Sequence, residues 1–152
     1  QKAYYATQNG IENSGPIPPK VGELTTYVAK WSIKNYFSEV KNLKVKTILP
    51  HNVSLKDYIF PEDQASNFSF DSKSREIVWL AGNLLPDNQA EITFQIVLMP
   101  DLSQRGRLAD LINQSVVFGE DISNGSIIQV SAPSVSTSLP SDEVNSGKGV
   151  VQ

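Results

Sequence analysis

The chain has 152 residues, of which 39% are hydrophobic and 19% are charged, and its formal net charge is -3. This length and composition fit one globular domain with a sizeable core and argue against disorder. The slightly acidic balance argues against a nucleic-acid binder, which would carry a basic surface. Because there is no cysteine, the sequence excludes disulfides and thiol chemistry, and its single histidine, His51, argues against a histidine-based metal cluster or catalytic triad.

No apolar run approaches the roughly 18 residues that a membrane-spanning helix needs, and residues 1–10 lack the apolar core of a signal peptide. We therefore expect no direct membrane insertion, and we expect any signal or anchor to lie outside this chain. Residues 1–14 contain the turn-forming stretches QNG and NSG and are predicted to be an irregular extension or linker. Pro16, Pro18 and Pro19 lack a backbone donor, so the next segment is predicted as an edge strand or a polyproline-like lead-in.

The stretch from residue 25 to residue 35 places Tyr27, Ala29, Trp31 and Ile33 at every second position, with mostly polar residues between them. A side-chain period of two is typical of a strand with one buried face and one solvated face. This stretch is predicted to be the first central strand.

A second strand is predicted near residues 40–49, where Leu43, Val45, Thr47 and Leu49 share one face and lysines occupy the other. A weaker strand follows at residues 55–60. Residues 68–81 predict a hairpin that turns at residues 71–74, and residues 89–100 predict the longest strand.

The segment from residue 101 to residue 112 is predicted to contain a short helix capped by Asp101. Two short strands around a Ser-Asn-Gly turn then close the module. Short strands at this spacing, with almost no helix, predict an all-β fold: an immunoglobulin-like antiparallel β-sandwich of about seven to nine strands with at most one short helix.

This reading divides the chain into an N-terminal extension (1–14), the sandwich (15–139) and a polar C-terminal tail (140–152). Although tails are commonly disordered, we expect Val150 and Val151 to dock the C-terminal tail on a strand edge or an apolar groove. The expected structural core consists of Tyr27, Trp31, Ile33, Val45, Leu49, Ile77, Trp79, Phe94 and Ile96.

Three stretches carry a family resemblance: PIPPKVGELTTYVAKWSIKN, LKVKTILPHNV and REIVWLAGNLLPDNQAEITFQIVLMP. Together they resemble the surface-exposed immunoglobulin-like repeat modules of bacteria known as the DUF11 or conserved-repeat type. The ending APSVSTSLPSDEVNSGKGVVQ is similar to the ends of large surface proteins from candidate-phylum bacteria. The resemblance implies a fold and an extracellular setting, and it implies no chemistry. The chain departs from the pattern at PDNQ, where such modules usually have a glycine.

Few residues suggest chemistry. Trp31 and Trp79 could form a sugar-binding platform, but both lie on the apolar phase of their strands and are expected in the core. Glu120 and Asp121 are weak calcium candidates, as are the acidic residues between positions 57 and 63, because neither stretch has the spaced oxygen ligands of a calcium loop. A pair of catalytic carboxylates would need a cleft, which a small sandwich rarely offers. We expect no enzyme activity and no cofactor.

The predicted function is that of a non-catalytic extracellular module that spaces or presents a larger bacterial cell-surface or adhesin-type protein. Its expected partners are neighbouring domains of that protein, and the isolated module is expected to be a monomer. One alternative is an adhesin domain that recognises a glycan or a protein. Another is a pilin-like subunit completed by a neighbour's strand, although the stretch KAYYAT is short and irregular for a donor strand.

The outward phase of two strands is unexpectedly apolar. Val78 and Leu80 are expected to point away from the core on one strand, and Val97 and Met99 on another. Contiguous exposed apolar patches usually indicate a covered or binding surface. We expect residues 108–112 to fold back as a helical turn and cover this face, with Leu111 buried. The alternatives are cover by the N-terminal tyrosines or a docking surface for a neighbouring domain.

Overall fold

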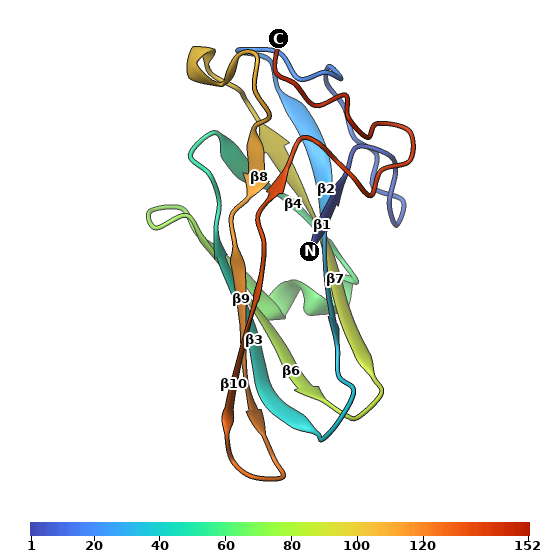
Figure 1. Cartoon of the computed structure of the whole chain (residues 1–152), viewed down its shortest axis with the longest axis vertical. Helices are drawn as coiled ribbons and strands as arrows, with labels where there is room; N and C mark the ends of the chain where they lie inside the picture. The colour runs from blue at the N-terminus through green and yellow to red at the C-terminus, as the bar shows by residue number, and fades with distance from the viewer.

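The computed structural model describes all 152 residues, which form two antiparallel sheets packed face to face (Figure 1). The first sheet has the strand order β1 (Lys2–Tyr4), β2 (Thr25–Lys34), β7 (Gln89–Leu98) and β4 (Val53–Phe60). The second sheet has the order β10 (Ile127–Ala132), β9 (Ser115–Asp121), β3 (Val40–Ile48), β6 (Glu76–Leu84) and β5 (Phe68–Asp71). The fold is therefore the β-sandwich that the alternation of the sequence predicts.

The remaining elements are short. Strands β8 (Asp110–Ile112) and β11 (Val135–Ser136) pair with each other, and two 3-10 helices, η1 (Glu62–Asn67) and η2 (Leu102–Gln104), take the place of the single short helix expected. The two main sheets hold four and five strands, in line with the predicted range. The proline-rich lead-in at residues 16–19 forms no strand. Neither helix has the length and the apolar character that crossing a membrane would require.

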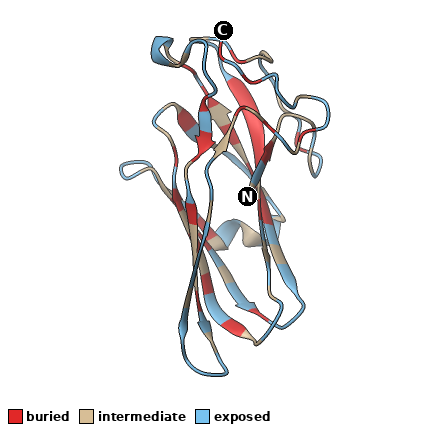
Figure 2. Cartoon of the chain, in the orientation of Figure 1, coloured by how far each residue is buried: buried red, intermediate tan, exposed pale blue.

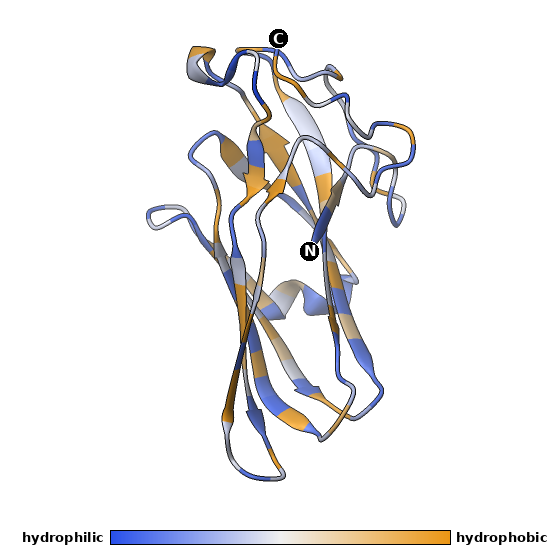
Figure 3. Ribbon diagram, in the orientation of Figure 1, coloured by the Kyte–Doolittle hydropathy of each residue, from blue (hydrophilic) through white to orange (hydrophobic).

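The register of the first sheet fixes which side chains enter the core. Tyr27 pairs with Ile96, Ala29 with Phe94 and Trp31 with Ile92, and all six residues are buried. The intervening residues of β2 face outward, as the alternation predicts. Figure 3 shows the resulting change between apolar and polar positions along the strands.

The second sheet repeats this arrangement. Val45 of β3 lies between Trp79 of β6 and Val117 of β9, with Thr47 opposite Ile77. The lysines of β3 alternate with these residues and face outward. Buried positions run along both sheets, whereas the turns at the ends of the sandwich are exposed (Figure 2).

The N-terminal residues are more ordered than the irregular segment that the sequence suggested. Lys2–Tyr4 form β1, and Ala3 joins the core. The chain then crosses the outer face of the first sheet, where the side-chain amide of Asn9 donates to the Thr93 hydroxyl (2.9 Å). The side-chain amide of Gln95 likewise donates to the backbone carbonyl of Glu12 (2.9 Å). This crossing is consistent with the complete burial of Val28, which faces outward from β2.

Residues 108–112 differ from the expectation. Asp101 caps η2 by accepting a hydrogen bond from the Ser103 backbone amide (2.7 Å), but the following residues form β8 and no helical turn. Leu111 is buried in the core cluster and does not cover an outer face. Met99 remains 52% exposed and Leu80 is also exposed, so residues 108–112 do not cover this face, although Leu111 is buried as predicted.

The C-terminal tail lies against the sandwich. Val150 forms a bridge with Leu108, and the Val151 backbone amide donates to the carbonyl of Arg107 (2.9 Å). The Gln152 backbone amide donates to the carbonyl of Pro19 (2.9 Å), its carbonyl accepts the backbone amide of Val21 (2.8 Å), and the Val151 side chain is buried in the core cluster. The last residues thus supply core surface as well as backbone hydrogen bonds.

Asp142 joins the two ends of the chain. One carboxylate oxygen accepts the backbone amides of Tyr5 and Ala6 (2.8 Å each). The other accepts the backbone amides of Val144 and Asn145 (3.1 and 3.0 Å). The Asp142 residue is only 1% exposed, so this carboxylate is a buried charge held by hydrogen-bond donors from both termini.

Candidate functional site

The two tryptophans are part of the core and form no surface platform. Their ring centroids lie 6.5 Å apart in a stacked arrangement across the two sheets, and Phe94 meets Trp31 edge-on at 5.0 Å. The Trp31 indole N–H donates to the Gln1 side-chain oxygen (3.0 Å), and that of Trp79 donates to the Gln64 side-chain oxygen (3.1 Å). Both indole donors are therefore satisfied within the protein.

Eight of the nine residues expected in the core lie in one buried cluster: Tyr27, Trp31, Val45, Leu49, Ile77, Trp79, Phe94 and Ile96. Ile33 is the exception, because it is only partly buried and packs against the cluster from its margin. Its side chain lines an apolar groove.

The weak calcium candidates Glu120 and Asp121 lie at the end of β9. The Asp121 carboxylate accepts hydrogen bonds from the backbone amide and the hydroxyl of Ser123 (2.8 and 2.6 Å), which stabilises its own turn. These hydrogen bonds, chiefly from the Ser123 hydroxyl, hold the pKa of Asp121 below its ordinary value. Glu120 is exposed on β9, and the structure contains no cluster of three acidic or histidine side chains that could hold a metal ion.

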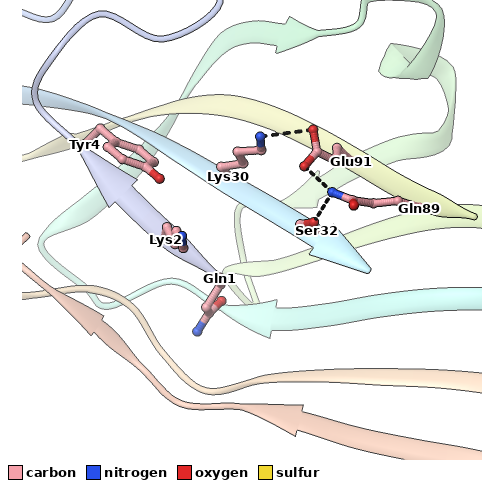
Figure 4. A pocket seen from close by; sticks show the side chains of 7 residues that line it. All are labelled: Gln1, Lys2, Tyr4, Lys30, Ser32, Gln89 and Glu91. Atoms are coloured by element: carbon pink, nitrogen blue, oxygen red, sulfur yellow. Dashed lines mark hydrogen bonds and ion pairs between the residues drawn. The ribbon is translucent and has the colours of Figure 1, made fainter. Parts of the chain in front are cut away.

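A polar pocket lies beside β1 on the outer face of the first sheet (Figure 4). It has a volume of about 360 Å³ and is lined by Gln1, Lys2, Tyr4, Lys30, Ser32, Gln89 and Glu91. Lys30 forms an ion pair with Glu91 (3.0 Å), and the Gln89 side-chain amide donates to both Ser32 (2.8 Å) and Glu91 (2.6 Å). The hydrogen bond from Lys30 is the main reason why the pKa of Glu91 lies below its ordinary value.

An apolar groove of about 400 Å³ lies on the inner side of the same region. It runs between the end of β2 and β10, and its walls come from the loop after β2, from β3, β6 and β9, and from the inner face of β10. Ten of its 14 lining residues are hydrophobic, including Ile33, Val117, Ile128 and Val130. Gly119 lies against Val40 and Leu43, which line the groove, and a Cβ at Gly119 would lie 2.6 Å from the Val40 side chain.

The polar pocket and the apolar groove share residue Ser32, and they meet at one strand edge. Residues 31–34 of β2 form this edge on the side away from β7, beyond Lys30, which pairs with Lys2 of β1. Sequence reasoning did not find the groove, because its lining residues come from segments that are far apart in the chain. The only signal of the groove in the sequence was that β10 carries apolar residues on both of its faces.

No protein-family model matches the chain, and no curated protein matches it. Among solved structures, the full-length major pilin SpaD from Corynebacterium diphtheriae aligns with a TM-score of 0.50 and 12% identity over 79% of this chain and 32% of that one. The RrgA Jo.In complex aligns with a TM-score of 0.50 and 9% identity over 85% of this chain and 87% of that one.

Three N-terminal domains of the type V pili tip protein Mfa5 from Porphyromonas gingivalis align with a TM-score of 0.47 and 14% identity over 64% of this chain and 21% of that one. The chain thus spans at most about a third of the length of the Mfa5 and SpaD chains. At these identities the likeness of the SpaD pilin and the RrgA complex shows the fold alone. The chain has an immunoglobulin-like β-sandwich fold of the kind found in bacterial pilin domains.

Proposed function

We propose that this chain is a non-catalytic extracellular structural module, a spacer or presentation unit of a larger bacterial cell-surface or adhesin-type protein. That the chain is a module of the DUF11 type, which its strands resemble, is part of this proposal. Neighbouring domains of the same protein are its proposed partners, it needs no cofactor, and the isolated module is a monomer. The proposal draws on a fold that pilin subunits share, but that fold alone does not determine the function.

The observation that carries the proposal is the shape of the sandwich, which is elongated along its strands (Figure 1). The C-terminus lies at one end of the long axis, and β1 starts near mid-length and runs toward that same end (Figure 1). An elongated module suits a protein in which modules are connected in series.

A tandem protein tests the spacer role. Two copies joined end to end should give a maximum dimension in small-angle X-ray scattering that is close to twice that of one copy. A compact particle in which the two copies fold back on each other would contradict the proposal. On the source bacterium, an antibody against the folded chain should label intact cells, and labelling only after permeabilisation would contradict the extracellular location.

A second candidate function is glycan binding at the polar pocket. The observation that favours it is the set of hydrogen-bonding side chains that surround Tyr4, since sugar hydroxyls need such groups beside an aromatic surface. A glycan array probed with the purified chain tests this function. Binding that Gln89→Ala abolishes and that Gln129→Ala, an exposed residue on the other sheet, leaves intact would support the adhesin function.

A further inference from the structure

The outer face of the second sheet is more open than that of the first. Residues 5–14 cross the outer face of the first sheet, where Asn9 and Gln95 form hydrogen bonds between the two layers. On the outer face of the second sheet, by contrast, Leu80 is 49% exposed and Ile48 is 51% exposed. Contiguous exposed apolar surface usually indicates a binding surface.

Two lysines stand among the apolar side chains of this outer face. Lys44 of β3 lies opposite Phe118 of β9 on one side and opposite Leu80 of β6 on the other. Two residues along the strand, Lys46 likewise has a valine on each side. A lysine stem packs along apolar surface while its ammonium group stays in solvent. The face therefore presents ammonium groups beside an apolar floor.

Two grooves run along this face and meet at Lys46 and Phe118, which line both of them. The first groove has a volume of about 330 Å³ and lies toward the start of β9, whereas the second has a volume of about 420 Å³ and lies toward its end. Strands β3 and β9 lie side by side through this region (Figure 1). Phe118 thus stands at the middle of one extended surface.

Lys44 is a positive charge on this surface that no carboxylate offsets. Glu76 lies 3.8 Å from the Lys46 ammonium group. Glu120 lies opposite Lys41 in the sheet register. These two glutamates are the only acidic residues that line the grooves, and Lys44 forms no ion pair. An anionic group on a ligand would complement Lys44.

Side-chain amides lie at both ends of the surface. Asn113 and Gln114 line the first groove, and Asn42 lines the second. The hydrogen bonds that these three residues form within the protein use their backbone groups, so their side-chain amides are free to bind a ligand. An amide both donates and accepts hydrogen bonds, and it can therefore pair with a sugar hydroxyl in either sense.

The backbone of this surface favours a sugar over a peptide. Strand β3 pairs with β6 on one side and with β9 on the other, so its backbone groups lie within the sheet. An extended peptide that is recognised through its backbone needs a free strand edge. A sugar ring instead needs an aromatic face and partners for its hydroxyls, which Phe118 and the amides supply.

We propose that the outer face of the second sheet binds an acidic glycan through one hexuronic acid unit. The ring of that unit stacks on Phe118, and its carboxylate accepts a hydrogen bond from the Lys44 ammonium group. Neighbouring units of the glycan lie along the two grooves, where Asn42, Asn113 and Gln114 pair with their hydroxyls. This inference goes beyond the spacer role, and its site is separate from the polar pocket beside β1.

The test is an NMR titration of the isotope-labelled chain with tetragalacturonic acid. Amide shifts should appear within residues 42–48 and 113–120, the two segments that line most of the grooves. The fully methyl-esterified tetrasaccharide has the same rings without the charge. It should bind at least about tenfold more weakly, because it gives Lys44 no charged acceptor.

Two variants test the residues. Lys44→Gln and Phe118→Ala should each weaken binding of tetragalacturonic acid by at least about tenfold. The matched controls Lys56→Gln, at an exposed position of β4, and Phe37→Ala, at a ring that is 84% exposed after β2, should change binding by no more than about twofold. Lys44→Gln keeps the test decisive if Phe118→Ala does not fold, because it breaks no ion pair.

Three outcomes would overturn the proposal. Shifts confined to the polar pocket and abolished by Gln89→Ala would support glycan binding at that pocket instead. Equal binding of tetraglutamate would show that the surface selects charge alone. No shifts at about 10 mM sugar would show that it binds no such unit. None of these results bears on the spacer role, which the tandem protein tests separately.

Discussion

Tyr27 has a buried hydroxyl without a hydrogen-bond partner in the protein. Burial, with a smaller effect of Tyr5, raises the pKa of Tyr27 well above its ordinary value. The ring itself is useful, because it packs edge-on against Tyr5 with the ring centroids 6.1 Å apart. The ring and the hydroxyl therefore act in opposite directions on stability.

Tyr27→Phe should increase the free energy of unfolding by about 1 kcal/mol, because a buried hydroxyl without a partner costs about 1–3 kcal/mol. Urea denaturation measures the change. The matched control is Tyr5→Phe, which should destabilise the protein because the Tyr5 hydroxyl donates to the carbonyl of Gly15 (2.7 Å). A loss of stability in Tyr27→Phe would mean that its hydroxyl has a partner.

Asp142→Asn should lower the free energy of unfolding by about 1–3 kcal/mol, since the backbone amides of Tyr5 and Ala6 lose a charged acceptor. Burial opposes ionisation of this carboxyl, but the hydrogen bonds from Ala6, Asn145 and Tyr5 outweigh it and lower its pKa below the ordinary 3.8. The stabilisation is therefore present above pH 3.8 and is lost as the pH falls through the lower pKa of the folded state.

Chemical denaturation between neutral pH and pH 2 measures both effects. The wild-type protein should lose stability below about pH 4 more steeply than Asp142→Asn does. Glu143→Gln, which changes an exposed neighbour, should keep the wild-type profile. Identical acid profiles for the wild type and Asp142→Asn would show that Asp142 gains no charge-dependent stabilisation from its contacts.

At the scale of elements, the C-terminal tail passes so close to the neighbouring chain that one position requires glycine. A Cβ on Gly149 would lie 1.6 Å from the carbonyl oxygen of Thr137. The Thr137 hydroxyl also donates to the Gly149 carbonyl (2.6 Å) and accepts the Ala109 backbone amide (3.0 Å). These contacts hold the tail, the chain after β11 and the start of β8 together.

Gly149→Ala should displace the tail and destabilise the protein by about 1–3 kcal/mol, as overpacking at tight contacts does. Carboxypeptidase digestion should release Gln152 and Val151 faster from this variant than from the wild type. Lys148→Ala, at the exposed neighbouring position, should leave the release rate unchanged. Equal rates for both variants would mean that Gly149 does not control docking of the tail.

The long elements could be predicted from the sequence because their alternation spans many residues. Tyr27, Ala29 and Trp31 entered the core as expected, and the hairpin of Phe68–Asp71 with β6 turned where it was predicted. The short elements could not be predicted. Leu108, Leu111 and Ile112 fit a helical turn equally well, and the partner of β8 lies more than 20 residues away at Val135.

The candidate site was beyond sequence reasoning for a related reason. The groove brings together residues from the end of β2, the loop after it, β3, β6, β9 and β10, and alternation within β2 gives no information about these neighbours. Ile33 was assigned to the core because it continues the alternation of Ala29 and Trp31, yet its exposure depends on whether a strand lies beside it. Neighbour relations between distant segments decide such features.

At the scale of the whole molecule, local stability should differ between the central strands and the edge strands of the sandwich. Strand β7 lies between β2 and β4 and contains five buried residues, whereas β10 is an edge strand with none. Local opening is easier where few apolar contacts are buried. In hydrogen-exchange mass spectrometry, β10 should therefore exchange faster than β7. Equal protection of the two strands would indicate that the sandwich opens only as one unit.

The position of the tryptophans has a practical consequence for spectroscopy. The chain contains two tryptophans, and both lie in the core between the two sheets with their ring centroids 6.5 Å apart. Intrinsic fluorescence therefore reports separation of the sheets, while detachment of the C-terminal tail leaves both indoles in their surroundings. A melting curve followed by fluorescence would record a protein with a frayed terminus as fully native, and only a label placed on the tail would distinguish the two.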